Sequence, residues 1–510
     1  MIRSPRVPEA TFIGLLSLYV AFGLCLGGAP LQDLPDHLTR AHIMADLLFN
    51  HGAQFGDQFA VKFDFSPYVA GDLLLASLDR GIGAAWAARV WIAALIGLLP
   101  LSVWFALRRL GAGAIAASTA GVLALYVATD HFFVLGFANY LFGVACAFFA
   151  YGWFCTAART GRAGAYAGFV LLLLLCYAVH LTALIFISAI TAVSVAFWVL
   201  TGRVPLRRAA VLMSAPVLLV VLQLATASGM DLIAQAAHIA SAAAHPGAGA
   251  GAAEGWRAVS KITGFAFPAE RFNLTADVAL FALLIATATF PMLLSWRGVT
   301  GVSAEPLLIA CALALLYVIT PPTVGGVWYA GVRPLQYALL FLIIAGVRSA
   351  ELRPGVQRAQ FALAVLVAVA NLAYVAVYML PVNAAMGRYK ALTASIPPGV
   401  TVLPVDTEPP RFYRPFLHAG AYATLNRDAL TPYLFSADNT PQMYYFRYRE
   451  RPYSPYESWY SANTSVRWDR VAREYQYVLV TAPWAAQKIP LSYTVVARND
   501  VAALLRLQDR

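Results

Sequence analysis

Long apolar stretches alternate with short polar connections over the first 380 residues of the chain. Crossing the hydrocarbon of a bilayer as a helix takes about 20 mostly apolar residues. Eleven stretches fit, near residues 10–30, 84–107, 113–130, 133–156, 164–181, 183–201, 209–227, 275–296, 305–321, 332–347 and 359–380. The pattern therefore predicts a polytopic α-helical membrane protein with about 11 transmembrane helices.

The pattern changes after about residue 380. Short runs rich in β-branched and aromatic residues alternate with Pro-rich connections, as expected for strands. These runs lie at 400–405, 475–482, 492–498 and 501–507. We predict a membrane domain at 1–380 and a soluble α/β domain at 381–510.

Composition agrees with this division. The 510 residues are 60% hydrophobic and 12% charged, against about 25% charged in a soluble globular domain. Residues 381–510 hold 25 charged residues and the first 380 hold 36. The formal charge of +11 is ordinary for a membrane protein with basic cytoplasmic loops, so we expect no nucleic-acid partner. The five cysteines lie in apolar runs without metal-ligand spacing.

The basic residues also predict an orientation. Cytoplasmic loops of membrane proteins are enriched in Lys and Arg. With the N-terminus in the cytoplasm, every short basic connection falls on that side: Arg3, Arg6, Arg108, Arg109, Arg159, Arg162, Arg203, Arg207, Arg208, Arg297, Arg348, Arg353 and Arg358. We therefore expect a multi-pass protein of the inner (plasma) membrane with a retained first helix. Loops 31–83 and 228–274 and the C-terminal domain would then be extracytoplasmic.

The first outer loop carries a dense polar cluster: Asp33, Asp36, His37, Arg40, His42 and Asp46. Apolar residues recur at helical spacing from Pro35 onward, which predicts an amphipathic helix at the membrane interface, with Asp33 as its N-cap. Either Asp33 only caps this helix and the other polar residues form its wet face, or the cluster lies in a wet cavity. The cost of placing carboxylates near a bilayer favours the cavity or paired partners.

Polar residues also mark the outer ends of other predicted helices, namely Asp130, His131, Asn139, His180 and Arg333. Helix ends on one face of a bundle can converge on a common pocket. Taken singly, His180 is equally consistent with a satisfied interfacial histidine and Arg333 with a side chain reaching the headgroups. No metal site is legible: the Asp/His cluster could hold a divalent cation, but its helical spacing occurs on any polar helix face.

Three segments carry a family resemblance: the sequence from Asp33 through Met44, Lys62 with Pro67, and AAWAARVWIAALIGLL at 84–99. They resemble the opening of the GT-C superfamily of polytopic glycosyltransferases, such as aminoarabinose transferases and protein O-mannosyltransferases. DLPDHLTRAHI, FANYLFGVA and YAVHLTAL are similar to an uncharacterised bacterial branch of these proteins. The usual Asp-Glu pair of the family is here Asp33-Leu34, with the next carboxylate at Asp36, so either aspartate could be the base.

The resemblance implies an inverting transfer of a sugar from a polyprenyl-phosphate donor to an extracytoplasmic glycan, lipid or protein acceptor. Such chemistry needs a base for the acceptor hydroxyl and cations for the departing phosphate. Asp33, or else Asp36, would be the base. Lys62, Arg89 and Arg333 would bind the phosphate, and the supporting polar residues would be His37, Arg40, His180 and Asn139.

Two other function classes remain open from the sequence. A lipid-linked glycan transporter or flippase would use the same polar residues to bind a headgroup, although transporters usually place such groups near the bilayer midplane. A glycan polymerase or ligase is the third possibility.

Two stretches have alternative interpretations. The aromatic, basic stretch at 444–460 could stack on a glycan acceptor. Alternatively, its side chains pack against the membrane domain or lie at its interface as amphipathic anchors. The Gly/Ala-rich part of loop 228–274 is typical of a linker, with an active-site lid as the alternative.

Overall fold

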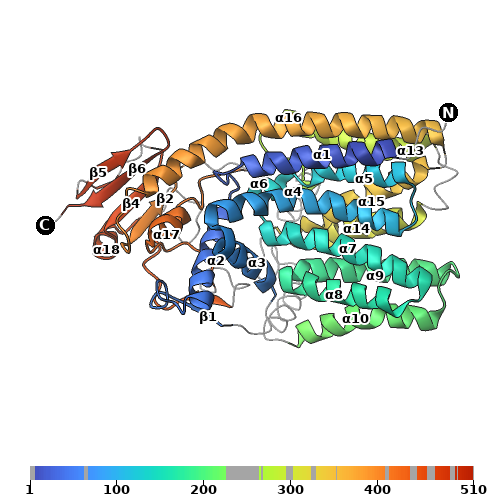
Figure 1. Cartoon of the computed structure of the whole chain (residues 1–510), viewed down its shortest axis with the longest axis horizontal. Coiled ribbons are helices and arrows are strands. Elements are labelled where there is room, and N and C mark those ends of the chain that lie inside the picture. Colours follow the sequence, from blue (N-terminus) through green and yellow to red (C-terminus); the bar gives the residue numbers. More distant parts are fainter. Residues whose placement is uncertain are drawn as a thin grey trace, which may run out of the picture. The chain divides into compact units, whose positions relative to one another are not determined.

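The computed structural model describes residues 6–62, 67–225, 264–265, 268–294, 303–322, 329–351, 353–407, 413–436, 445–455, 466–482, 489–490 and 492–508. The chain divides into two compact units. The helical unit comprises Met1–Tyr19, Ile96–His131 and Asn139–Ala373, and the mixed unit comprises Val20–Leu95, Phe132–Ala138 and Tyr374–Arg510. Three long helices, α1 (Arg6–Cys25), α4 (Ala84–Arg109) and α16 (Pro354–Thr393), contribute residues to both units (Figure 1).

All eleven apolar stretches form helices, which confirms the predicted polytopic helical fold. Besides α1, α4 and α16, they form α5 (Ala114–Val127), α7 (Ala138–Thr160), α8 (Ala163–Val179), α9 (Leu181–Leu200), α10 (Leu206–Leu224), α13 (Leu274–Leu294), α14 (Ala304–Ile319) and α15 (Arg333–Ala350). The short helix α6 (His131–Leu135) precedes α7. The chain is a multi-pass membrane protein.

Ten of these helices are apolar enough for a membrane: seven are long enough to span it and three, α5, α8 and α14, are shorter. The eleventh, α15, carries Arg333 and Gln336 in its first turn and Arg348 near its end. It packs against α5, α13 and α14, and a Cβ at Gly346 would lie 1.7 Å from the Ala288 carbonyl oxygen. Protein neighbours therefore surround α15, which explains how it keeps polar residues that lipid would disfavour.

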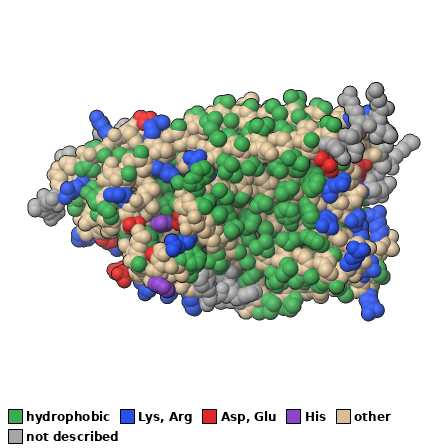
Figure 2. Space-filling model, in the orientation of Figure 1, with side chains coloured by type: hydrophobic (Ala, Val, Ile, Leu, Met, Phe, Trp, Pro, Cys, Tyr) green, Lys and Arg blue, Asp and Glu red, His purple; other side chains and the backbone are tan. Residues whose placement is uncertain are grey.

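The surface of the helical unit fits contact with lipid. Large apolar side chains are exposed on several helices, including Leu171 on α8 (67%) and Leu218 on α10 (58%). Hydrophobic side chains cover most of the middle of the face seen in Figure 2, and Lys and Arg side chains lie toward both ends of the view. The exposed arginines of the described helix ends include Arg108, Arg159, Arg162, Arg203, Arg207 and Arg208.

The mixed unit contains the predicted C-terminal sheet. Its strand order is β2 (Val402–Val405), β4 (Tyr477–Thr481), β6 (Ala502–Leu507), β5 (Tyr493–Arg498). Strands β2 and β4 are parallel, and the other two pairs are antiparallel. Each strand falls within one of the four predicted runs, which confirms a mixed sheet at the C-terminus. Helix α18 (Trp468–Glu474) packs Val471 into the core of this sheet.

A second, two-stranded sheet joins loop 31–83 to the C-terminal region of the mixed unit. Strand β1 (Phe59–Val61) pairs antiparallel with β3 (Phe446–Tyr448). The Phe59 ring lies 5.4 Å from that of Phe446 and 4.8 Å from that of Tyr448. Phe446 and Tyr448 are therefore buried against β1 of loop 31–83, which favours packing over stacking on a sugar for these two residues. Residues 444 and 456–460 of the same stretch lie outside the described residues.

Three shorter helices complete the mixed unit: α2 (Leu34–Phe49), α3 (Val69–Ile82) and α17 (Ala421–Arg427). Helix α2 packs against both others. The predicted boundary at 380/381 stays a prediction, because the mixed unit also includes the first outer loop. The Gly/Ala-rich part of loop 228–274 lies outside the described residues.

Candidate functional site

Asp33 immediately precedes α2, at the predicted N-cap position, but its side chain makes no capping hydrogen bond. Its carboxylate accepts a hydrogen bond from Gln32 Nε2 at 3.4 Å. The backbone N–H groups of Gln32 and Asp33 donate to the carbonyls of Val134 and Leu135, at 3.1 and 3.0 Å. The predicted cap therefore does not account for the Asp33 side chain.

The polar face of α2 is buried within the mixed unit. Asp36 is 1% exposed, His37 6% and Arg40 0%. The interpretation of these residues as a wet helix face is therefore wrong, because α3 and α17 cover the helix. Burying several ionisable groups requires partners for them, and the structure supplies partners from distant parts of the sequence.

Arg40 is paired with Asp72 of α3. Arg40 Nε and Nη2 donate to the two Asp72 oxygens at 2.6 and 2.9 Å, the two-pronged geometry that suits guanidinium and carboxylate. Burial opposes ionisation of Asp72, but the charge and hydrogen bonds of Arg40 together with those of His37 outweigh it and hold the pKa of Asp72 below its usual range. Tyr445 also donates a hydrogen bond to Asp72, and His37 Nδ1 lies 2.9 Å from Arg40 Nη2.

Asp33 and Asp36 meet at a third residue, His418, which the sequence did not indicate. His418 Nε2 lies 3.4 Å from an Asp33 oxygen, and His418 Nδ1 lies 3.4 Å from an Asp36 oxygen. We call these three residues the Asp–His–Asp cluster. Burial, followed by the Asp33 charge, raises the pKa of Asp36 well above its usual range. Burial lowers the pKa of His418 to about 3, with further contributions from His37 and Arg414.

The two shifts act on the cluster in different ways. His418 is neutral at physiological pH, and Asp36 tends to hold a proton. The Asp33 side chain is 13% exposed and that of Asp36 2%, so Asp33 is the more accessible carboxylate. A neighbouring pair of carboxyl groups in unlike surroundings is the arrangement in which one serves as acid or hydrogen-bond donor and the other as base.

The segment that carries His418 is tied to the residue before Asp33. The Arg414 backbone N–H donates to Gln32 Oε1 at 3.1 Å. The Arg414 guanidinium, only 3% exposed, forms an ion pair with Asp406. These contacts bring residues 413–418 against the start of α2, and no local motif in this segment predicts them.

Two cations of the mixed unit meet at the C-terminal end of α1. Arg89 Nη1 donates to the Leu24 carbonyl at 2.9 Å, and Lys390 Nζ donates to the Gly27 carbonyl at 3.3 Å. Arg89 lies so close that a Cβ at Gly27 would be 2.2 Å from its guanidinium. Lys390 also lies over the Tyr422 ring, at 4.7 Å. Arg89 was a predicted phosphate ligand, whereas Lys390 was not.

Lys62, another predicted phosphate ligand, directly follows β1. Its backbone N–H donates to the Tyr445 carbonyl at 2.8 Å, and its side chain is exposed. The residue is thereby fixed beside the strand pair that joins the first outer loop to the C-terminal region.

Within the helical unit, two predicted site residues are in contact. Arg333 Nη1 lies 2.8 Å from His180 Nε2, and the guanidinium lies 4.9 Å from the centre of the Tyr140 ring. His180 Nδ1 contacts Thr182 Oγ1 at 2.7 Å. His180 thus caps α9 and contacts Arg333 at the same time. Asn139 precedes Tyr140 and is 4% exposed.

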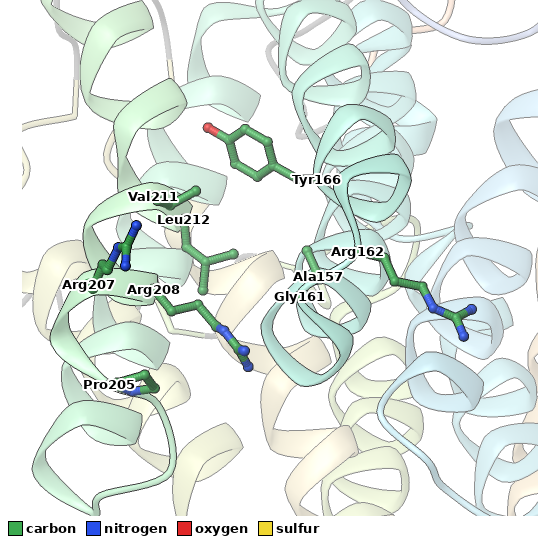
Figure 3. Close-up of a pocket in the computed structure, with 9 residues that line it drawn as sticks. All are labelled: Ala157, Gly161, Arg162, Tyr166, Pro205, Arg207, Arg208, Val211 and Leu212. Atoms are coloured by element: carbon green, nitrogen blue, oxygen red, sulfur yellow. The ribbon is translucent and has the colours of Figure 1, made fainter.

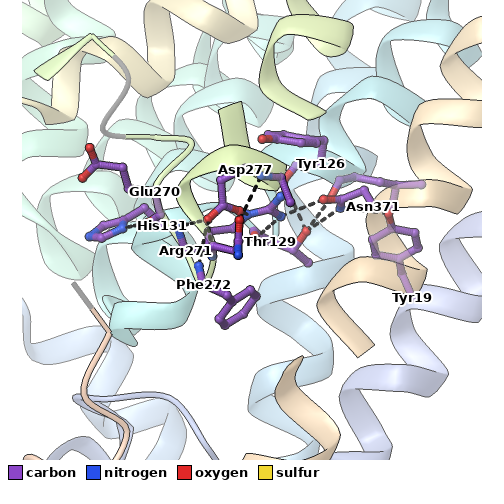
Figure 4. Close-up of polar contacts among 12 residues, drawn as sticks. Tyr19, Tyr126, Thr129, His131, Glu270, Arg271, Phe272, Asp277 and Asn371 are labelled. Atoms are coloured by element: carbon purple, nitrogen blue, oxygen red, sulfur yellow. Dashed lines mark hydrogen bonds and ion pairs between the residues drawn. The ribbon is translucent and has the colours of Figure 1, made fainter. Parts of the chain in front are cut away.

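A second buried network of the helical unit was not predicted (Figure 4). Arg271 donates to Asp277 at 3.2 Å, to Asn371 Oδ1 at 2.7 Å and to the Thr129 carbonyl at 3.2 Å. Asp277 also accepts from three consecutive backbone N–H groups, those of residues 271–273. Asn371 donates to Thr129 and Tyr19. The network joins the start of α13 to α5, α16 and α1.

Among the residues that the structure describes, no group of three or more His, Cys, Asp or Glu side chains is placed to hold a metal ion. Two aspartates of the predicted Asp/His set, Asp33 and Asp36, lie in the Asp–His–Asp cluster. Each has a carboxylate oxygen 3.4 Å from a ring nitrogen of His418.

No family model matches the chain, and no curated protein matches its sequence. Solved structures are similar to it, and two of them are states of one protein. ArnT from Cupriavidus metallidurans bound to undecaprenyl phosphate aligns with a TM-score of 0.52 at 13% identity, over 96% of this chain and 98% of ArnT. The apo state of the same protein gives a TM-score of 0.52 at 14% identity, over 97% and 98%. The chain therefore has a fold similar to that of ArnT.

Proposed function

We propose that this protein is a membrane glycosyltransferase that moves a sugar from a polyprenyl-phosphate donor to an extracytoplasmic acceptor, with inversion at the anomeric carbon. The proposal rests on the Asp–His–Asp cluster at the start of α2, in a fold that matches ArnT over nearly its whole length. ArnT binds undecaprenyl phosphate in one of the two solved structures. The coarse function comes from this fold, and the residue roles come from the cluster.

Asp33 is the proposed general base. It takes the proton of the acceptor hydroxyl while the hydroxyl oxygen bonds to the anomeric carbon and the bond from that carbon to the phosphate oxygen breaks. The products are the glycosylated acceptor and the polyprenyl phosphate. Asp36 suits this role less, because its raised pKa favours the protonated form, which cannot accept a proton.

The departing phosphate needs positive charge near it. Arg89 and Lys390 offer two half-buried cations that both contact Gly27, and no carboxylate pairs with either of them among the described residues. Lys62 and Arg333 remain candidates for the same role. Guanidinium groups suit phosphate because their donors can engage two oxygens at once.

The proposed orientation follows the basic helix ends. Excess arginine marks cytoplasmic connections, so the arginine-rich end of the helical unit would face the cytoplasm. The first outer loop and the C-terminal sheet would then be extracytoplasmic, where the polyprenyl-linked donor presents its sugar.

Undecaprenyl phosphate release separates transfer from transport. Purified protein in liposomes is given the lipid-linked sugars and acceptors extracted from the producing bacterium, and free undecaprenyl phosphate is followed by mass spectrometry. We expect release by the natural protein and by Asp57→Asn, which alters an exposed aspartate of the same loop. We expect none by Asp33→Asn.

Two results would overturn the proposal. Release by Asp33→Asn at the natural rate would remove this residue as base. Movement of intact donor across the bilayer without any release would identify a transporter.

A further inference from the structure

A cavity of about 320 Å³ lies in the helical unit between the turn joining α7 to α8 and the first turns of α10 (Figure 3). Its lining includes Gly161, Arg162, Tyr166, Arg207, Arg208 and Val211, and contains no carboxylate. The size is at the lower end of small-molecule sites, which run from about 300 to 1,000 Å³. The cavity is thus large enough for a polar headgroup and is positively charged.

Arg208 and Tyr166 form opposite walls of this cavity. Arg208 Nη1 donates to the Ala158 carbonyl at 3.2 Å, and its guanidinium lies 3.2 Å from the place of a Cβ on Gly161. The Tyr166 hydroxyl reaches Ser214 Oγ of α10 at 2.8 Å. A guanidinium has five N–H donors, so the bond to Ala158 leaves others for an anion.

An apolar row leads away from the cavity along α10. Val211 lines the cavity and is 52% exposed, and Leu218 and Leu222 are 58% and 45% exposed. Residues at i, i+7 and i+11 share one face of a helix. In a membrane protein such an exposed row faces lipid chains, so the cavity combines a cationic head region with an apolar path.

We infer that this cavity binds an anionic glycerophospholipid, with the headgroup phosphate against Arg208 and an acyl chain along Val211, Leu218 and Leu222. Basic pockets between membrane helices are typical sites for anionic headgroups. The positive-inside bias explains why arginines occur at these helix ends. It does not explain a cavity that they line without any carboxylate and that continues into an apolar row.

The test uses the full-length protein in neutral micelles, titrated with phosphatidylglycerol, with bound lipid counted by native mass spectrometry. A basic side chain near anionic lipid contributes about 1 kcal/mol, so Arg207→Gln and Arg208→Gln should each weaken binding about five-fold. Val211→Glu, which adds a carboxylate at an exposed position of the lining, should weaken it at least as much. Arg203→Gln is the matched control, because Arg203 is exposed in the connection just before α10 but outside the lining.

Arg208→Gln also removes a bond to α7, so its unfolding temperature is measured in parallel, and Arg207→Gln and Val211→Glu decide the matter if that variant unfolds. Equal loss for Arg203→Gln would show general attraction to anionic lipid and overturn the inference. The unfolding temperature is also measured with phosphatidylglycerol and with inorganic phosphate alone. If phosphate raises it as much as the lipid does, the cavity is a free-phosphate site and the inference is overturned. Phosphatidylcholine bound as tightly as phosphatidylglycerol would contradict the role of charge.

Discussion

The Asp–His–Asp cluster of the mixed unit and the Arg271–Asp277–Asn371 network of the helical unit are both buried and polar, but their charges are balanced differently. In the network, one guanidinium faces one carboxylate, and amide and hydroxyl groups take further bonds. In the cluster, two carboxyl groups face one imidazole whose pKa lies far below its usual value. The first arrangement has its charge matched, and in the second the raised pKa of Asp36 favours its protonated form.

Burial of charge by itself therefore does not mark an active site in this protein. A matched pair stabilises one arrangement of the chain and gains nothing from changing protonation. A set with one carboxyl group too many can accept and release a proton with little rearrangement, which is what general acid–base chemistry requires.

The largest expected effect separates the two sets by function. Asp33→Asn should reduce transfer by about 10²- to 10⁴-fold, the usual contribution of a general base, with the unfolding temperature unchanged. Asp277→Asn should lower the unfolding temperature, with turnover per folded molecule retained. Donor consumption and thermal unfolding are measured on both variants, and a reversal of the two results would contradict the assignment.

Breaking the buried ion pair between Arg40 of α2 and Asp72 of α3 should destabilise the fold strongly. Asp72→Ala leaves Arg40 charged, buried and without its carboxylate, for which we expect a loss of about 3–5 kcal/mol in the free energy of unfolding. Asp500→Ala is the control, because it removes an ion pair with Arg388 of similar length, 2.9 Å, on the surface. That change should cost about 0–1 kcal/mol, and equal losses would show that burial of the pair does not matter.

A smaller loss in the free energy of unfolding is expected from a change inside the helical unit. Asn371→Leu removes the amide oxygen that accepts from Arg271, and a hydrogen bond to a charged group contributes about 1.5–3 kcal/mol. Thr289→Val, which removes only a bond from Thr289 to the carbonyl of Ile285 in its own helix, should change the free energy of unfolding by less. Denaturant titrations in micelles compare the two variants.

Stability should also depend on pH through the cluster, by at most about 1.4 kcal/mol per pH unit for each proton. His418 has a pKa of about 3 when folded and about 6.5 when unfolded. Its contribution is therefore present above pH 6.5 and is lost as the pH falls from 6.5 toward 3. His418→Gln should flatten the unfolding temperature over the accessible part of this range, pH 4 to 6.5.

The pH dependence of stability that Asp36 contributes has the opposite sign. Its folded pKa is raised, so its contribution is present below the unfolded value of about 3.9 and is lost as the pH rises through the folded value. Asp36→Asn should remove that loss at higher pH. An unchanged pH profile in both variants would show that neither group titrates as the structure indicates.

Sequence patterns predicted the helices and the C-terminal strands because both depend on local periodicity. Runs of about 20 apolar residues form helices in lipid whatever follows them, and α7 and α13 need no distant information. Strands β4 and β6 likewise appear as short β-branched runs between turns. The fold class could therefore be read from the chain alone.

The site could be predicted only in part. The density of polar residues around Asp33 and Asp36 was visible, but their partner His418 lies almost 400 positions away and carries no motif. Asp72 and Tyr445, which complete the surroundings of Arg40, are separated by 373 positions. Burial of the α2 polar face follows from tertiary packing, which helical periodicity cannot reveal.

The hydrogen bond from Tyr445, which precedes β3, to Asp72 of α3 also sets an order of events during synthesis. Ribosomes add about 5–20 residues per second, so Asp72 waits roughly 20 to 75 seconds before Tyr445, 373 positions later, has been made. During that time the polar side of α2 lacks α17 and Tyr445, and the part that they cover is open to proteases and chaperones. A polypeptide cut short before residue 413 would carry Asp33 and Asp36 but never assemble the surroundings that set their acidity.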